Sequence, residues 1–179
     1  MKKIMFSDAF CLTKAVLDET KTMTRRILRK DIPLGNWQET EKMLPYKVGE
    51  IVAIAQSYHN LNKSGYTAPE WLDHVCESSA GYENKMFVRA DLMPHHIKIT
   101  DVKVERLQSI SDDDILREGV WQFHYDNELF YVSKNIGYAP EVAFPSAREA
   151  FWYLIDKISG KGTWELNPWV VAYGFELVD

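Results

Sequence analysis

The chain has 179 residues, of which 46% are hydrophobic and 26% are charged, the mix of an ordinary globular domain. Its formal net charge of -5 argues against a protein that coats long stretches of nucleic-acid backbone, because such proteins usually present a basic face. No apolar stretch predicts a transmembrane helix, and the first four residues lack the apolar run of a signal peptide. Cys11 and Cys76 form no C-x-x-C pair, so we expect free thiols in a reducing cytoplasm.

The first half of the chain alternates short apolar runs with polar segments. Residues 4–6 predict a first strand, and residues 8–18 predict a helix that Ser7 caps, because their apolar positions recur at helical spacing. An irregular connection is expected at residues 31–44, before a turn and a buried strand at 51–55. The long polar segment that follows, residues 59–85, predicts a binding loop or lid with a short helix at 68–75.

The second half carries the clearest periodic signals. Strands are predicted at residues 86–90, at 96–107 with a kink near Asp101, and at 169–177. Helices are predicted at 112–118, capped by Ser111 and ended by Gly119, and at 146–158, where Ser146 and Glu149 form a capping box. Between them, residues 121–145 are aromatic and loop-like, with short strands expected at Phe123 and at 129–132.

Short strands distributed among three helices predict an α+β fold, a small twisted β-barrel decorated by about three helices. We see no internal repeat and no linker. The prediction is therefore a single domain over residues 1–179, with long inserted loops at about 59–85 and 121–145.

Six consecutive residues, Lys21 to Arg26, place an amine, two hydroxyls and two guanidinium groups in one short segment. Lys21 is a potential base or anion clamp if its ammonium is desolvated, and Thr24 is a potential nucleophile if a base adjoins it. Arg25 and Arg26 can bind a phosphate, a carboxylate or a base edge in a bidentate manner. The alternative is purely structural, since cations at the end of a helix favourably oppose its dipole.

Four segments together resemble a known family. They are the Lys-Thr-x-Thr-x-Arg motif at 21–26, the Pro-Tyr-Lys-Val-Gly-Glu turn at 45–50, the strand at 99–107 with its acidic helix ending in Glu118-Gly119, and the motif at 151–155 with Asn167-Pro168-Trp169. This combination, which spans residues 4–178, resembles the ASCH domain, a branch of the PUA-like superfamily. It is similar to the larger ASCH-like proteins often encoded by phages and prophages. One position departs from the family pattern, because Glu19 stands where the family usually has Gly.

The resemblance implies a PUA-like β-barrel with a cleft that binds RNA or a modified nucleoside or nucleotide. Thr22, Arg25 and Arg26 are the candidate ligand-binding residues of the motif. Tyr58 and His59 open the long loop, where they are expected to line the cleft. The acidic net charge favours a small or single-nucleotide ligand over long RNA.

A second hypothesis also follows from the resemblance. Some small bacterial members are amidohydrolases that remove the acetyl group of N4-acetylcytidine with a Lys, a Thr and a Glu, which correspond by motif to Lys21, Thr24 and Glu118. Lys21 would take the Thr24 proton, Thr24 would attack the amide carbonyl, and Glu118 would protonate the leaving nitrogen. We prefer the binding hypothesis, because a motif alone does not place three side chains together.

No metal or cofactor is expected. The five histidines do not occur at metal-ligand spacing, and the adjacent His95 and His96 point to opposite faces of a strand. Gly160-Lys161-Gly162-Thr163 lacks the order of a phosphate-binding loop and predicts a helix stop. The expected partner is RNA or a nucleoside or nucleotide, and no membrane association is expected.

Overall fold

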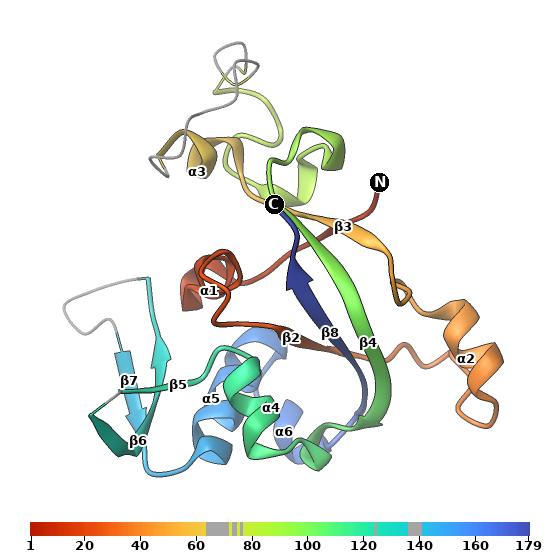
Figure 1. Ribbon diagram of the computed structural model, residues 1–179, viewed down its shortest axis with the longest axis vertical. Helices are drawn as coiled ribbons and strands as arrows, with labels where there is room; N and C mark the ends of the chain where they lie inside the picture. Colours follow the sequence, from red (N-terminus) through yellow and green to blue (C-terminus); the bar gives the residue numbers. More distant parts are fainter. Residues whose placement is uncertain (64–71, 73–74, 76, 124, 136–140) are drawn as a thin grey trace.

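In the computed structural model, a twisted five-stranded sheet runs through the middle of the molecule, with helices around it and a second small sheet beside it (Figure 1). The structure describes residues 1–63, 72, 75, 77–123, 125–135 and 141–179. The predicted α+β class is confirmed. Pairing among the described strands does not join the two outer strands of the sheet, so hydrogen bonds do not close it into a complete barrel.

The strand order of the large sheet is β1 (Lys3–Ile4), β3 (Ile51–Ile54), β4 (His96–Arg106), β8 (Trp169–Leu177) and β2 (Met23–Ile27). β1 runs parallel to β3, and the other neighbours are antiparallel. The predicted kink in β4 is confirmed, because its register against β8 shifts between Ile99 and Asp101. β4 and β8 form the long curved centre of the sheet (Figure 1).

The predicted N-terminal helix is interrupted. A 3-10 turn at Asp8–Phe10 is followed by α1 (Leu12–Leu17), and Cys11 between them adopts the left-handed region with φ 54°. Leu12 and Val16 of α1 are buried in the core that covers one face of the large sheet. The chain then turns back at Thr20 and Lys21, whose amide groups both donate to the Ala15 carbonyl at 2.9 Å, and enters β2.

A second core joins the remaining helices to the small sheet. Its elements are α4 (Asp112–Arg117), α5 (Ala147–Ser159), α6 (Thr163–Leu166), β5 (Trp121–Phe123), β6 (Asp126–Ser133) and β7 (Glu141–Phe144). Both predicted helix caps are confirmed, since the Ser111 hydroxyl accepts from the Asp114 amide and the Ser146 hydroxyl from the Glu149 amide, each at 3.2 Å. The apolar stripe of α5 packs into this core.

Two local predictions were wrong. Residues 86–90 do not form a strand but lie across two 3-10 turns, Lys85–Phe87 and Ala90–Leu92. The connection expected at residues 31–44 contains α2 (Trp37–Met43), which begins because the Asn36 side chain accepts from the Gln38 amide at 3.0 Å. The segment after residue 58 opens with α3 (Tyr58–Lys63). Most of the helix predicted at 68–75, and Cys76, lie outside the described residues.

Within the described ranges, no helix is both long enough and apolar enough to span a bilayer. The same residues contain no group of three histidine, cysteine or acidic side chains that could hold a metal ion.

Gly119 ends α4 at a point of close packing, and this generates a first prediction. Its φ is +103°, and a Cβ atom placed on it would lie 2.9 Å from Leu12 Cδ2 of α1. We expect Gly119→Ala to lower the free energy of unfolding by about 2 kcal/mol, because it adds backbone strain and a steric clash. Urea denaturation measures this change.

Gly35→Ala is the matched control, because a Cβ atom there meets nothing within 4 Å. Its effect should stay within about 0.5 kcal/mol. Equal stabilities of the two variants would contradict the argument for Gly119.

Candidate functional site

Strand β2 divides the polar segment between the two faces of the sheet, because successive side chains of a strand point to opposite sides. Arg25 extends toward α4 and β4, where its carboxylate partners lie. Arg26 extends to the other face, with its guanidinium 5.9 Å from the centre of the Phe6 ring. Thr24 shares the face of Arg26 and pairs across the strands with Tyr173.

The Lys21 ammonium is buried and fully hydrogen-bonded. It donates to the Met23 carbonyl at 2.7 Å, to the Glu118 carbonyl at 2.6 Å and to Glu118 Oε2 at 2.9 Å. An ammonium has three N–H donors, so these acceptors fill its capacity. Burial lowers the pKa of Lys21, and the facing Glu118 carboxylate offsets only part of that change. Lys21 and Glu118 therefore form a buried ion pair.

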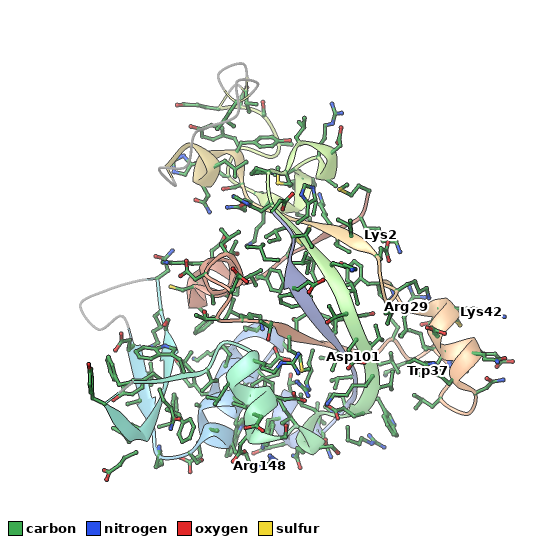
Figure 2. All side chains as sticks on the ribbon, in the orientation of Figure 1. Lys2, Arg29, Trp37, Lys42, Asp101 and Arg148 are labelled. Carbon is green, nitrogen blue, oxygen red and sulfur yellow. The ribbon has the colours of Figure 1, made fainter. Side chains whose placement is uncertain are left out.

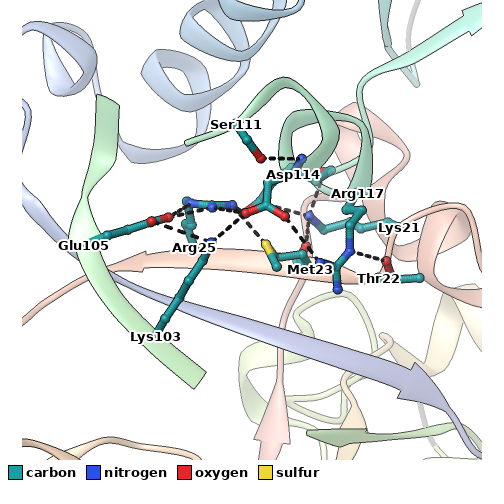
Figure 3. A network of polar contacts seen from close by, with 10 residues as sticks. Lys21, Thr22, Met23, Arg25, Lys103, Glu105, Ser111, Asp114 and Arg117 are labelled. Carbon is teal, nitrogen blue, oxygen red and sulfur yellow. Dashed lines mark hydrogen bonds and ion pairs between the residues drawn. The ribbon is translucent and has the colours of Figure 1, made fainter. Parts of the chain in front are cut away.

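Arg25 is held by three carboxylates at once (Figure 3). Its side chain is 0% exposed. Its Nε and Nη2 groups bond Glu105 at 3.0 and 2.6 Å, Nη2 also bonds Asp114 at 2.8 Å, and Nη1 bonds Glu118 at 3.0 Å and the Met23 sulfur at 3.1 Å. These contacts use all five N–H donors of the guanidinium, which leaves none for a ligand.

Asp114 extends this charge network to the surface. Besides Arg25, it accepts from Lys103 at 2.7 Å and from Arg117 at 3.3 Å. Burial raises the pKa of the Asp114 carboxyl, but the hydrogen bonds from Lys103 and Arg25 outweigh burial and lower the pKa below its ordinary value. The network as a whole joins β2, β4 and α4 through its cations and anions, Lys21, Arg25, Lys103, Arg117, Glu105, Asp114 and Glu118.

A cavity of about 320 Å³ opens beside this network. Its polar lining comes from Lys21, Thr24, Arg25, Arg26 and Glu118. Its apolar lining comes from the N-terminal segment and from one face of α5, and includes Met5, Phe6, Leu12, Phe151, Leu154, Ile155 and Ile158. The cavity therefore has charged groups on one wall and aliphatic and aromatic groups on the other.

The structure brings the three candidate catalytic residues to this one cavity. Lys21 and Glu118 are in direct contact, and Thr24 lines the same space. However, no hydrogen bond in the described part of the chain joins the Thr24 hydroxyl to either of them. The arrangement thus supplies an ion pair next to a hydroxyl, without a base already positioned on that hydroxyl.

Arg26 is the cation of the cavity with unused hydrogen-bonding capacity. One Nη2 donor bonds the Met5 carbonyl. Its Nε is buried and has no partner among the described residues. Burial lowers the pKa of Arg26, which means that the cavity disfavours this charge more than water does. An acceptor placed in the cavity would relieve both conditions.

The other candidate ligand-binding residues lie elsewhere. The Thr22 hydroxyl accepts from Arg117 Nε at 3.2 Å. Tyr58 is buried in a third core, where its hydroxyl accepts from the Arg89 amide at 3.2 Å. His59 packs edge-on against Tyr82, with ring centres 5.4 Å apart. None of the three belongs to the described lining of the cavity.

The sequence patterns did not identify several residues that build the site. From the sequence, Asp114 was placed only in the predicted helix at 112–118, and Glu105 only in the predicted strand at 96–107. Asp114 and Glu118 are four residues apart on one short helix, a spacing that places both carboxylates on one face. That spacing was the available signal, whereas the long-range contact with Arg25 has no local signature.

The backbone conformation at Glu19 is one that favours glycine. Its backbone adopts the left-handed region with φ 57°. Glycine reaches this region without steric cost, whereas other residues pay roughly 1 kcal/mol. Glu19 therefore adopts a conformation that a glycine would reach without strain, at a small cost in stability.

Comparison with known proteins gives limited similarity. No protein-family model matches the chain, and no curated protein matches it. Among solved structures, protein EF3133 from Enterococcus faecalis V583, of family DUF984, is 16% identical, with a TM-score of 0.44 over 100% of this chain and 77% of that chain. The ASCH domain from Lactobacillus crispatus JV V101 is 12% identical, with a TM-score of 0.39 over 96% of this chain and 75% of that chain. An ASCH domain is thus among the structures that this chain is similar to.

The lowered pKa of Asp114 generates a second prediction, on the pH dependence of stability. A carboxylate whose pKa is lower in the folded state stabilises the fold above its unfolded pKa, and this contribution is lost as pH falls through the folded pKa. We expect Asp114→Asn to reduce the free energy of unfolding by about 3 kcal/mol at pH 7, because the buried Arg25 loses a charged partner. The deficit should shrink as the pH falls below 3.8, the ordinary pKa of this group.

Chemical denaturation at a series of pH values measures this effect. Asp113→Asn, on the exposed side of the same helical turn, is the control and should cost less than about 1 kcal/mol. A deficit in Asp114→Asn that is the same at pH 7 and pH 3 would show that its charge does not contribute.

Proposed function

We propose that the cavity between β2 and α5 recognises a nucleobase, presented by RNA or by a free nucleoside or nucleotide, modified or unmodified. The observation that carries the proposal is the division of its lining, with charged donors and acceptors on one wall and apolar groups on the other. A nucleobase has the complementary form, since its faces are apolar and its edge carries donors and acceptors.

Individual groups support this assignment. Arg26 offers an unpaired donor to a carbonyl or ring nitrogen of the base edge. Thr24 offers a hydroxyl that can donate or accept, and Glu118 offers acceptor oxygens. Leu154 and Ile155 of α5 supply apolar surface for the face of the ring. Glu118 is held in place by Lys21 and Arg25, so the polar wall is ordered before a ligand arrives.

The geometry favours binding over catalysis. A general base must be neutral, whereas the Lys21 ammonium already donates three hydrogen bonds. Deprotonation would remove one of the two cations that balance Glu118. In this state Lys21 serves the architecture of the polar wall, and Thr24 acts as a hydrogen-bonding group.

Calorimetric titration with the four ribonucleosides and their 5′-monophosphates tests the proposal. We expect saturable binding of at least one base. Arg26→Gln should weaken that binding about tenfold or more, because a hydrogen bond from a charged donor is lost. Arg89→Gln, which changes an exposed arginine paired with Asp91, should leave binding unchanged. The proposal fails if no nucleoside or nucleotide binds, or if both variants bind as the unmodified protein does.

The salt dependence of binding distinguishes RNA from a free nucleoside or nucleotide as the ligand. A ligand held only in the cavity should show an almost flat dependence of affinity on salt concentration. A steep dependence would indicate several phosphate contacts and hence an RNA strand.

A second candidate function is amide hydrolysis of an acylated nucleoside. It is favoured by one observation, that Lys21, Thr24 and Glu118 line the same cavity while burial lowers the pKa of Lys21. In this mechanism the proton of the Lys21–Glu118 ion pair first moves to Glu118, and neutral Lys21 then accepts the Thr24 proton as the Thr24 oxygen bonds the acyl carbon. The carbon–nitrogen bond breaks as Glu118 gives its proton to the leaving nitrogen. Water then releases the acyl group from Thr24.

Incubation with N4-acetylcytidine, followed by chromatographic detection of cytidine, tests this candidate. The rate should pass through a maximum and fall at both high and low pH, because the Lys21–Glu118 pair must hold a single proton that moves between the two groups. Thr24→Val should abolish the release of cytidine while leaving the denaturation midpoint nearly unchanged. Absence of cytidine at high protein concentration would exclude this activity.

A further inference from the structure

A second and smaller cavity, of about 250 Å³, lies between α2 and the start of β8. It is lined by Leu34, Trp37, Thr40, Val104 and Trp169. The two tryptophans are 46% and 36% exposed, respectively, although large aromatic side chains usually bury most of their surface. We call this cavity the tryptophan slot, after Trp37 and Trp169.

Arg106 holds the side chain of Trp169, the first residue of β8, in place. The Arg106 guanidinium lies 4.6 Å from the centre of its ring, and Arg106 Nη1 donates to the Asn167 carbonyl at 3.2 Å. Arg106 and Trp169 are also direct partners in the β4–β8 ladder. An aromatic ring that is already ordered loses less entropy when a ligand stacks on it.

Positive charge adjoins the slot. Arg106 and Lys30 are exposed and form no ion pair within the described residues, whereas the neighbouring Arg29 pairs with Asp31 at 2.5 Å. The segment that carries Arg29 and Lys30 starts beside the slot, because the Leu28 amide donates to the Trp169 carbonyl at 2.9 Å. Arg106 reaches the slot from the end of β4, where it pairs with Trp169. Arg29 and Trp37 lie on the same side of the molecule, next to α2 (Figure 2). Exposed aromatic rings beside unpaired cations are the usual components of single-strand binding sites.

The slot and the larger cavity are close neighbours along the sheet. Ile27 lines the cavity and pairs across the strands with Val170, the residue after Trp169. Thr24 lines the cavity, and Leu28 bonds Trp169 of the slot. These two residues are four positions apart along the chain, a separation of roughly 13 Å at the rise of an extended strand. That separation suits two bases of one strand better than two parts of one nucleoside.

We propose that the tryptophan slot stacks an unpaired base of a single-stranded oligonucleotide, another base of which occupies the larger cavity. The inference rests on the proposed function and narrows it, because it makes the ligand an oligonucleotide rather than a free nucleoside. Among the described residues, no charged side chain lines the slot itself, so stacking supplies the binding there and Lys30 and Arg106 contact phosphates. The slot accepts any base, since every base has an aromatic face.

Fluorescence anisotropy with 5′-labelled RNA hexamers of adenylate, cytidylate and uridylate tests this inference on the full chain. At least one hexamer should bind more tightly than its mononucleotide. Trp37→Ala and Trp169→Ala should each weaken hexamer binding about tenfold, the usual effect of losing one stacked base. Neither variant should change mononucleotide binding in the larger cavity. Trp37→Phe, which keeps an aromatic face, should restore most of the affinity.

Trp152→Ala is the matched control, because Trp152 is 41% exposed but lies on α5, outside the slot. It should bind hexamers as the unmodified protein does. A DNA hexamer that binds equally well supports stacking without recognition of the sugar, and preferential RNA binding supports an added ribose contact.

The inference is overturned if hexamers bind no more tightly than mononucleotides, or if both tryptophan variants bind them normally. In that case mononucleotide binding that depends on Arg26 would leave the proposed function intact. Conversely, hexamer binding that depends on Trp37 and Trp169 but not on Arg26 supports the slot and removes the larger cavity from the proposal.

Discussion

The burial of two adjacent cationic side chains is the constraint on which the site depends. Lys21 and Arg25 are removed from water, and an unpaired buried charge costs several kcal/mol. The carboxylates of Glu118 and Asp114 on α4 and of Glu105 on β4 must therefore be brought to them. This requirement fixes α4 against β2. Gly119 permits this close packing, since a Cβ atom there would clash with Leu12 of α1.

The alternation of strand β2 separates structural from functional roles within one short motif. Arg25 faces the carboxylates and uses every donor it has, so its contribution to a ligand is indirect, through the position of Glu118. Arg26 faces the opposite side and keeps an unused donor. Two neighbouring arginines that look equivalent in the sequence thus differ because one residue along a strand reverses the direction of the side chain.

The elements predicted correctly are those that depend on local chemistry. The hydroxyl caps of α4 and α5 and the alternation of β4 act within a few residues, so their sequence patterns were sufficient. Helix α2 was missed because its cap, Asn36, lies in a segment with Pro33 and Gly35, which suggested an irregular loop. The partners of Arg25 lie 80 to 93 residues away in the chain, and no local pattern specifies contacts at that separation. The resemblance named Lys21, Thr24 and Glu118 as candidates, but their common position at one cavity comes from the fold.

The acidic net charge is compatible with a nucleic-acid ligand, because the positions of the charges matter more than their sum. The cations of the buried network are balanced by its own carboxylates and contribute little field outside the protein. Among the unbalanced cations, Arg26 lies on β2, Lys30 lies shortly after it, and Arg106 ends β4. A few phosphate contacts of this kind cannot retain a long strand against repulsion from a chain of net charge -5. They can orient a short strand whose affinity comes mainly from bases held in the cavity and on the tryptophans, so the same charge distribution that permits binding also limits the length of the ligand.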